Sequence, residues 1–168
     1  MKKLILISAL LFSFNVFADN DADTIEEGGI LFKEYPNKFF NGPLILFHSN
    51  GTIKEKLAYK DGLKEGSRMT FHENGNLFEQ ETYLKGKLEG VFKGYYDNEE
   101  LWWEGFAMNN LRHGEIKVFY ETGKLKYMGQ YRFNLKEGLW KYFNEEEVIN
   151  NQECYQNNEL VKLNKCGI

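Results

Sequence analysis

Residues 66–90 read GSRMTFHENGNLFEQETYLKGKLEG, which is one complete copy of a pattern that runs through most of the chain. The pattern is marked by five glycines spaced 24 residues apart: Gly42, Gly66, Gly90, Gly114 and Gly138. When each copy is numbered from its glycine, the sixth residue is always aromatic: Phe47, Phe71, Tyr95, Phe119 and Phe143. The twelfth residue is always Ile or Leu. Self-similarity at a fixed period indicates a repeat architecture.

Each copy has the features of a β-hairpin. A short strand-like run from Gly66 ends at Asn74-Gly75, a dipeptide that suits a type I′ turn. A second run follows and ends at a return turn such as Lys85-Gly86. The sequence therefore predicts an all-β fold, an elongated single twisted antiparallel meander of tandem 24-residue β-hairpins. We expect the sixth and twelfth positions to form its core ladder, capped by Tyr at position 18.

The repeats define the domain organisation. Tyr35 falls in the same register, so residues 29–41 are predicted to be a half repeat. Five full repeats then start at residues 42, 66, 90, 114 and 138, the repeat region ends at residue 161, and residues 162–168 form a C-terminal tail.

Residues 1–18 are predicted to be a signal peptide. Lys2 and Lys3 precede an apolar run from Leu4 to Phe14, and Val16 and Ala18 supply the small residues before a cleavage point. A membrane anchor is the alternative, but a spanning helix needs about 20 apolar residues. We therefore expect export to the periplasm, the cell envelope or the outside, with residues 19–28 as an acidic arm.

Charge excludes some partners. The chain has a net charge of −4, and loss of Lys2 and Lys3 with the signal peptide leaves 19 basic and 25 acidic residues, or −6. An anionic domain is repelled by phosphate backbones and anionic lipids. We expect no nucleic-acid partner and no membrane insertion after cleavage.

The motifs KEGLWKYF (136–143) and FYETGKLKYMGQY (119–131) resemble the bacterial variant MORN repeat. The resemblance implies hairpin sheets that serve as scaffolds and interaction surfaces, without a shared catalytic residue. Many bacterial members are labelled antitoxins of the YwqK type. Two repeats depart from the pattern, with Glu99-Glu100 and Glu145-Glu146-Glu147 at their turns, and we expect looser turns there.

No catalytic, cofactor or metal site is predicted. His48 and His72 occupy one repeat position, and His113 stands alone. Histidines on neighbouring hairpins could bind a metal, but no carboxylate or Cys lies at a suggestive spacing. Three glutamates precede repeat glycines and are assigned turn and solubility roles: Glu65, Glu89 and Glu137.

The two cysteines, Cys154 and Cys166, both lie near the C-terminus. An even number of cysteines in an exported chain favours a disulfide. Such a bond would pin the tail to the last hairpin. Two free thiols in a reducing cytoplasm are the alternative.

Trp102 and Trp103 interrupt the pattern. Neighbouring strand residues face opposite sides, so both cannot enter one core face. We predict a partner-binding surface of Phe92, Tyr96, Trp102 and Trp103, since exposed aromatic residues are enriched at interfaces. A locally thicker core or a covering loop would also explain the tryptophans.

These features together predict an exported, non-enzymatic scaffold that presents a β surface to a protein partner. An antitoxin-like neutraliser of a cognate toxin and a glycan-binding surface protein are the alternatives. Open sheet edges also permit self-association.

Overall fold

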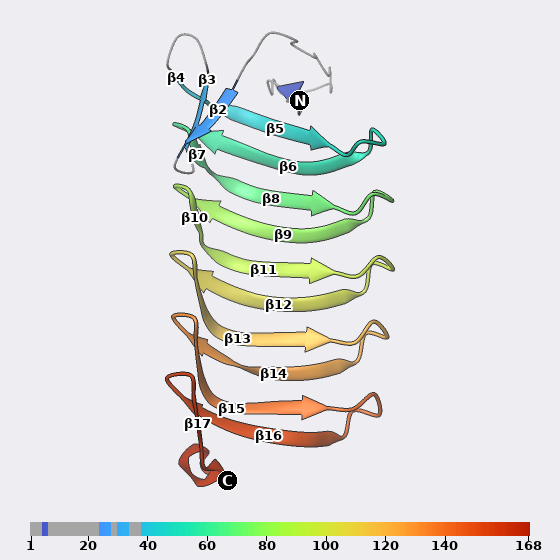
Figure 1. Ribbon diagram of the computed structural model, residues 1–168, viewed down its shortest axis with the longest axis vertical. Helices are drawn as coiled ribbons and strands as arrows, with labels where there is room; N and C mark the ends of the chain where they lie inside the picture. Colours follow the sequence, from blue (N-terminus) through green and yellow to red (C-terminus); the bar gives the residue numbers. More distant parts are fainter. Residues whose placement is uncertain (1–4, 7–23, 28–29, 34–37) are drawn as a thin grey trace. The chain divides into compact units, whose positions relative to one another are not determined.

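The computed structural model describes residues 5–6, 24–27, 30–33 and 38–168, with side-chain surroundings from Phe39 onward. These residues form antiparallel β-sheet almost throughout, and a single 3₁₀ helix, η1 (Leu163–Cys166), lies near the C-terminus (Figure 1). The chain divides into two units, residues 1–87 and 88–168. In the described part of the chain, no helix is long and apolar enough to cross a membrane.

Unit 1 contains two full repeats. Its long strands are β5 (Gly42–Phe47), β6 (Ile53–Lys60), β8 (Gly66–Phe71) and β9 (Leu77–Leu84). They pair antiparallel in chain order, while β1 (Ile5–Leu6) pairs with β5 and β7 (Leu63–Lys64) pairs with β6. A separate three-stranded sheet contains β2 (Thr24–Glu27), β3 (Ile30–Lys33) and β4 (Lys38–Phe39).

The N-terminal predictions fall largely outside the described residues. Apart from β1 and β2, the predicted signal peptide and acidic arm are not described. The predicted half repeat, residues 29–41, contributes β3 and β4 to the separate sheet.

Unit 2 contains the last three repeats. After β10 (Lys87–Leu88) at its boundary come β11 (Gly90–Tyr95), β12 (Leu101–Met108), β13 (Leu111–Phe119), β14 (Leu125–Arg132), β15 (Leu135–Phe143), β16 (Ile149–Gln156) and β17 (Glu159–Val161). From β11 to β17 each strand pairs antiparallel with the next. The predicted all-β fold of antiparallel hairpin repeats is confirmed.

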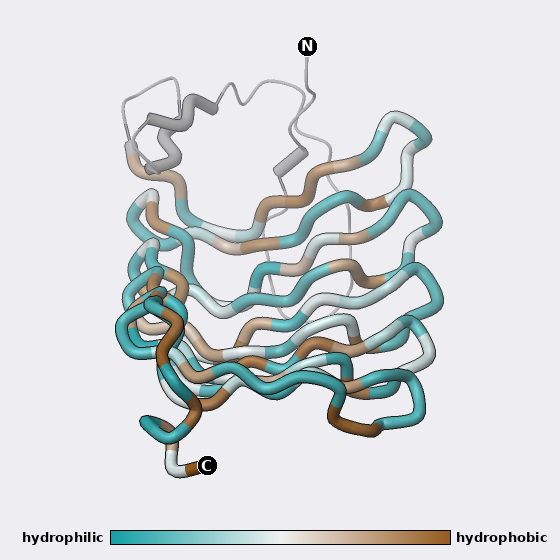
Figure 2. Tube along the Cα trace, turned by 60° about the horizontal axis from the view of Figure 1, so that its bottom comes forward, coloured by the Kyte–Doolittle hydropathy of each residue, from teal (hydrophilic) through white to brown (hydrophobic). Residues whose placement is uncertain are grey.

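The core lies on a different face from the one predicted. The sixth and twelfth positions do pair directly, as in Phe119↔Leu125, but most of these residues are only half-buried. The buried side chains are Phe40, Leu44, Leu57 and Tyr59 in unit 1, and Phe92, Ala107, Ile116, Val118, Trp140 and Cys154 in unit 2. Most of them occupy repeat positions 3, 5, 16 and 18. Figure 2 shows hydrophobic segments recurring within the strands of successive hairpins.

The physical reason is alternation combined with a bulge. Successive strand residues face opposite sides, so position 6 faces away from positions 3 and 5. Each full repeat has a register shift beside position 6, for example between Val118 and Phe119. We call the face of positions 3, 5, 14, 16 and 18 the inner face, and the opposite face the outer face.

The Asn-Gly turns are not the type I′ turns that were predicted. At Asn50-Gly51 the Gly51 N–H donates to the His48 carbonyl at 3.1 Å, and Gly51 alone has a positive φ, +87°. This is a type I turn followed by a left-handed residue, the usual three-residue hairpin loop. The return turns have two consecutive positive φ values, as type I′ requires: Asp61-Gly62, Lys85-Gly86, Asn109-Asn110, Phe133-Asn134 and Asn157-Asn158.

The turns expected to be looser keep the same hydrogen bonds. Glu99 and Glu147 stand in the place of the glycine, with φ of 68° and 60°. Glu99 N–H donates to the Tyr96 carbonyl at 3.0 Å, and Glu147 N–H to the Asn144 carbonyl at 2.9 Å. The expectation of looser geometry was therefore wrong, and the departure instead places two non-glycine residues in a strained conformation.

One repeat places charge on the inner face. Arg68 occupies position 3, where the other repeats have Leu44, Phe92, Ile116 and Trp140. Its guanidinium contacts three carboxylates: Glu55 at 2.5 Å, Glu81 at 2.6 Å and Glu79 at 3.6 Å. Three anions around one cation leave this cluster with a net negative charge.

The cluster changes the titration of its members. Burial would lower the pKa of Arg68, but hydrogen bonds to Glu55 and Glu81 raise it above its ordinary value. Burial raises the pKa of Glu79, and the charge of Glu81 adds to this. Burial, with the charge of Glu81 and its hydrogen bond, also raises the pKa of Tyr83 to about 12.

The strained glutamates yield a first prediction. Glu147→Gly should stabilise the protein by about 1 kcal/mol, because glycine tolerates a positive φ that costs other residues about that much. Glu146→Gly makes the same change of side chain and charge at a residue without a positive φ. Thermal unfolding should show a higher Tm for Glu147→Gly alone, and equal effects of the two substitutions would contradict the assignment of strain.

The Arg68 cluster yields a second prediction. A carboxyl whose pKa is raised on folding destabilises the fold when it is ionised, and this cost appears as the pH rises through the raised pKa. Glu79→Gln should therefore add about 0.5 kcal/mol of stability at pH 7 and no stability near pH 3. Glu81→Gln, the matched control, should lose about 1.5 kcal/mol at pH 7, because Arg68 loses a charged acceptor. Urea unfolding at both pH values tests this, and a destabilised Glu79→Gln at pH 7 would refute it.

Candidate interaction surface

The two tryptophans differ in pairing and exposure: Trp103 lies opposite Gly94, whereas Trp102 is skipped by the register shift that follows. Trp103 faces inward and packs against Phe92, with ring centroids 5.4 Å apart. Trp102 lies against the Tyr96 ring at 5.4 Å and remains 38% exposed. Phe92 is 8% exposed and belongs to the core of unit 2, so it does not contribute to an exposed surface. Of the four residues predicted to bind a partner, Trp102 is therefore the clearly exposed member.

Further exposed apolar side chains lie on the same hairpin as Trp102. Phe106 lies four residues after it on β12. Val91 on β11 lies directly opposite Phe106. Val91 is 52% exposed and Phe106 is 38% exposed. We call Val91, Trp102 and Phe106 the outer patch. Sequence reasoning missed Val91 and Phe106, whose direct pairing is given by the strand register.

Charged residues border the outer patch. A depression of about 260 Å³ is lined by Val91, Phe106, Glu104, Glu115 and Lys117, together with the backbone of Gly105. Glu104 pairs with Lys93 at 3.4 Å, and Glu115 pairs with Lys117 at 3.2 Å. Apolar side chains surrounded by charges that remain in water have the composition of a protein interface.

The inner face of unit 2 carries an aromatic groove. A depression of about 300 Å³ is lined by Phe92, Trp102, Trp103, Arg112, Ile116, Val118, Tyr127 and Tyr131. The Arg112 guanidinium lies over the Tyr131 ring, 4.4 Å from its centroid. Burial raises the pKa of Tyr127. The groove presents flat apolar surfaces and one cation at its border.

Position 7 has a structural role. His48 Nε2 forms a 2.8 Å hydrogen bond with the carbonyl oxygen of Phe71, one repeat further along. The Tyr96 and Tyr120 hydroxyls donate in the same way to the carbonyls of Phe119 and Phe143, each at 2.8 Å. The interpretation of the histidines as repeat residues is consistent with these contacts. Within the residues that the structure describes, no group of three or more His, Cys, Asp or Glu side chains could hold a metal ion.

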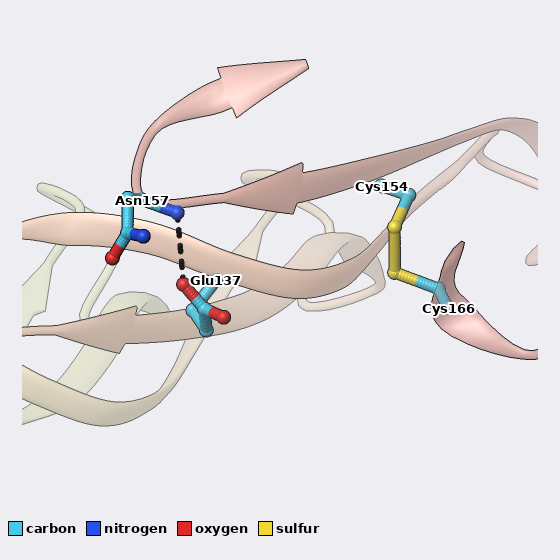
Figure 3. Close-up of a disulfide and its surroundings, with 4 residues drawn as sticks. All are labelled: Glu137, Cys154, Asn157 and Cys166. Carbon is cyan, nitrogen blue, oxygen red and sulfur yellow. Dashed lines mark hydrogen bonds between the residues drawn. A yellow bond between two sulfur atoms is a disulfide. The ribbon is translucent and has the colours of Figure 1, made fainter. Parts of the chain in front are cut away.

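The glutamates before the repeat glycines also bind the next repeat. Glu65, Glu89 and Glu137 each accept a hydrogen bond from the first N–H of a return turn 20 residues later, at 2.7–2.9 Å. Figure 3 shows the bond from Asn157 N–H to Glu137. In the remaining unit 2 repeat the residue is His113, whose ring lies 4.7 Å from the Phe133 ring. His113 Nδ1 is buried and has no hydrogen-bond partner among the described residues.

A disulfide joins Cys154 on β16 to Cys166 in η1, with Cα atoms 5.9 Å apart (Figure 3). It ties the C-terminal tail to the last hairpin. The Cys154 side chain is fully buried, so this link lies within the packed part of unit 2.

Comparison with known proteins identifies the repeat type. A family model described as "MORN repeat variant" matches residues 40–61, 64–85 and 112–132. These segments coincide with the first, second and fourth full hairpin units. No curated protein matches the chain.

Several solved structures show a weak likeness. An S. aureus TarM mutant in complex with fondaparinux, alpha-GlcNAc-glycerol and UDP is 11% identical, with a TM-score of 0.38, over 70% of this chain and 21% of that chain. TarM itself is 13% identical, with a TM-score of 0.31, over 82% of this chain and 21% of that chain. The GtfA/B complex bound to UDP and GlcNAc is 10% identical, with a TM-score of 0.26, over 80% of this chain and 24% of that chain.

This chain therefore spans less than a quarter of the length of those proteins, and the TM-scores are too low to indicate a shared fold. The family match is supported independently by the 24-residue period, the paired strands and the two turns of each unit. Three segments of the chain therefore match the variant MORN repeat, and the 24-residue period continues through the other units.

Proposed function

We propose that this protein is an exported, non-enzymatic scaffold that binds a protein partner through the outer patch. The observation that carries the proposal is that Val91, Trp102 and Phe106 all remain exposed on the β11–β12 strand pair, with Val91 directly opposite Phe106. Exposed aromatic residues surrounded by charged groups are enriched where proteins bind one another. The family match supports the coarser conclusion of a repeat scaffold.

Export is supported by two observations. Residues 1–18 have the charge and hydropathy pattern of a signal peptide. The disulfide between Cys154 and Cys166 suits an oxidising compartment. A cytoplasmic toxin would not meet an exported neutraliser, so the antitoxin-like alternative requires a toxin in the same compartment.

Glycan binding is the second candidate, and the inner groove favours it. Trp103, Tyr127 and Tyr131 provide aromatic surface there, and Arg112 provides a cation. This composition suits a sugar ring that carries an acidic group. The groove residues also pack in the core, however, which leaves less of each ring exposed than in the outer patch.

The outer patch yields a third prediction. The double substitution Trp102→Ala and Phe106→Ala should weaken binding of a partner captured from the native envelope at least 10-fold, because aromatic anchors supply much of the binding energy of an interface. The control is Leu84→Ala with Val148→Ala, which truncates two side chains that are also exposed but lie elsewhere. Pull-down followed by titration calorimetry tests this.

Both double variants should unfold near the temperature of the native protein, since all four side chains are partly in solvent. Unchanged binding by the Trp102 and Phe106 variant would refute the outer patch. Binding of an acidic glycan on an array that is lost in Trp103→Ala and retained in Phe106→Ala would support the second candidate instead.

A further inference from the structure

Strand β16 has an outer edge that is only partly paired. Inside unit 2, β14 has neighbours on both sides, because Tyr127 lies opposite Val118 on β13 and Tyr142 on β15. Among the described residues, β16 is paired along its length with β15 but with β17 only from Cys154 to Gln156. We call the outer side of Ile149–Glu153 the β16 edge. An edge of this kind presents unpaired N–H and C=O groups to an added strand.

The chain itself is held away from this edge. The 24-residue period would place the glycine of a sixth repeat at position 162, but this residue is Lys162. Strand β17 ends just before it, at Val161. The following residues form η1, and the disulfide fixes Cys166 beside Cys154 (Figure 3). Because β17 is short and its continuation is tied beside Cys154, the C-terminal tail does not extend along Ile149–Glu153 (Figure 1).

The internal pairing rule gives the register of an added strand. Between consecutive repeats, positions 14, 15 and 16 lie opposite positions 5, 4 and 3, as Trp103, Glu104 and Gly105 do opposite Val118, Lys117 and Ile116. The equivalent residues of the β16 edge are Asn151, Gln152 and Glu153. A strand added in the same way would place its third position opposite Glu153.

The chemistry of the edge selects a cationic occupant. Glu153 accepts hydrogen bonds from the Tyr142 hydroxyl at 2.7 Å and the Tyr155 hydroxyl at 2.9 Å. The hydrogen bond from Tyr142 lowers the pKa of Glu153 and keeps it ionised. The preceding turn adds the exposed Glu145, Glu146 and Glu147. Opposite charges across a strand pair are favourable, whereas burial of a carboxylate against an apolar side chain is costly.

This chain already pairs a third-position cation with a position-16 carboxylate, within one hairpin. Arg68 lies opposite Glu81 in its own hairpin, and it also contacts Glu55 at position 14 of the preceding one. A second copy of the chain would instead bring Leu44 of β5 opposite Glu153, which leaves the carboxylate facing an apolar side chain. A basic strand therefore fits the β16 edge better than self-association does.

We propose that the β16 edge binds an extended segment of a partner protein as an added antiparallel strand, with a Lys or Arg of that segment opposite Glu153. This deepens the proposed function, on which it rests, by assigning a second contact surface and the chemistry of its ligand. The outer patch and the β16 edge are separate, so each can be tested without the other.

The test uses a labelled peptide with the sequence KEGSRMTFH, residues 64–72, and the purified chain. Fluorescence anisotropy should show saturable binding. Replacement of the peptide arginine by glutamate should weaken binding at least 10-fold, and methylation of every second backbone nitrogen should abolish it. Glu153→Gln in the protein should weaken binding at least 10-fold, whereas the matched Glu115→Gln should leave it unchanged.

If Glu153→Gln fails to fold, the peptide with glutamate in place of arginine still tests the proposal, because it is measured against the native protein. Lack of saturable binding, equal binding of the methylated peptide, or equal binding of the arginine and glutamate peptides would overturn the proposal. Concentration-dependent self-association that the peptide abolishes would assign the edge to a second copy and also overturn it. Trp102→Ala should leave peptide binding unchanged, so a failure here is distinguishable from a failure of the outer patch.

Discussion

The structure depends on acceptors for the N–H groups of its return turns. Most of these N–H groups belong to exposed residues, so a hydrogen bond to the chain replaces one to water and serves to position the turn. This chain supplies the acceptors from the preceding repeat. Asn110 N–H donates to the Leu88 carbonyl at 3.0 Å, and Asn109 N–H donates to the Glu89 carboxylate at 2.8 Å. The same two bonds recur for Asn158 and Asn157. Each turn therefore fixes the register of the hairpin before it, and the 24-residue period follows from that fit.

A second contact between repeats shows how the sequence varies without loss of this register. Two residues before the repeat glycine, a cation lies over the ring at position 18 in three cases: Lys64 with Tyr83, Arg112 with Tyr131, and Lys136 with Tyr155. The remaining pairs are Phe40 with Tyr59, an edge-to-face contact at 5.8 Å, and Leu88 with Ala107 in the core of unit 2. Cation–π, aromatic and aliphatic pairs thus fill the same place. In the pair where Ala107 stands in place of the tyrosine, Leu88 stands in place of the cation.

Local patterns predicted the hairpins and the positions of their turns, because these depend on neighbouring residues. The buried face could not be read in the same way, since a one-residue bulge beside position 6 reverses the alternation that the prediction used. The role of Arg68 could not be predicted from the sequence either, because its three carboxylate partners lie on the two neighbouring strands, β6 and β9. Of the candidate interaction surface, Trp102 was predictable as a break in the repeat. Its neighbours Val91 and Phe106 became recognisable only once the strands were paired.

The glutamate before a repeat glycine holds the return turn that lies 20 residues later. Amide hydrogen exchange tests it most directly, because unit 2 contains an internal comparison. The N–H groups of Asn109 and Asn157 have carboxylate acceptors. The equivalent residue Phe133 lies 20 residues after His113, and His113 Nδ1 has no hydrogen-bond partner among the described residues. We expect slow exchange at Asn109 and Asn157 and faster exchange at Phe133. In Glu89→Ala, protection should be lost at Asn109 alone. Equal protection at all three amides, or an unchanged Asn109 in Glu89→Ala, would contradict it.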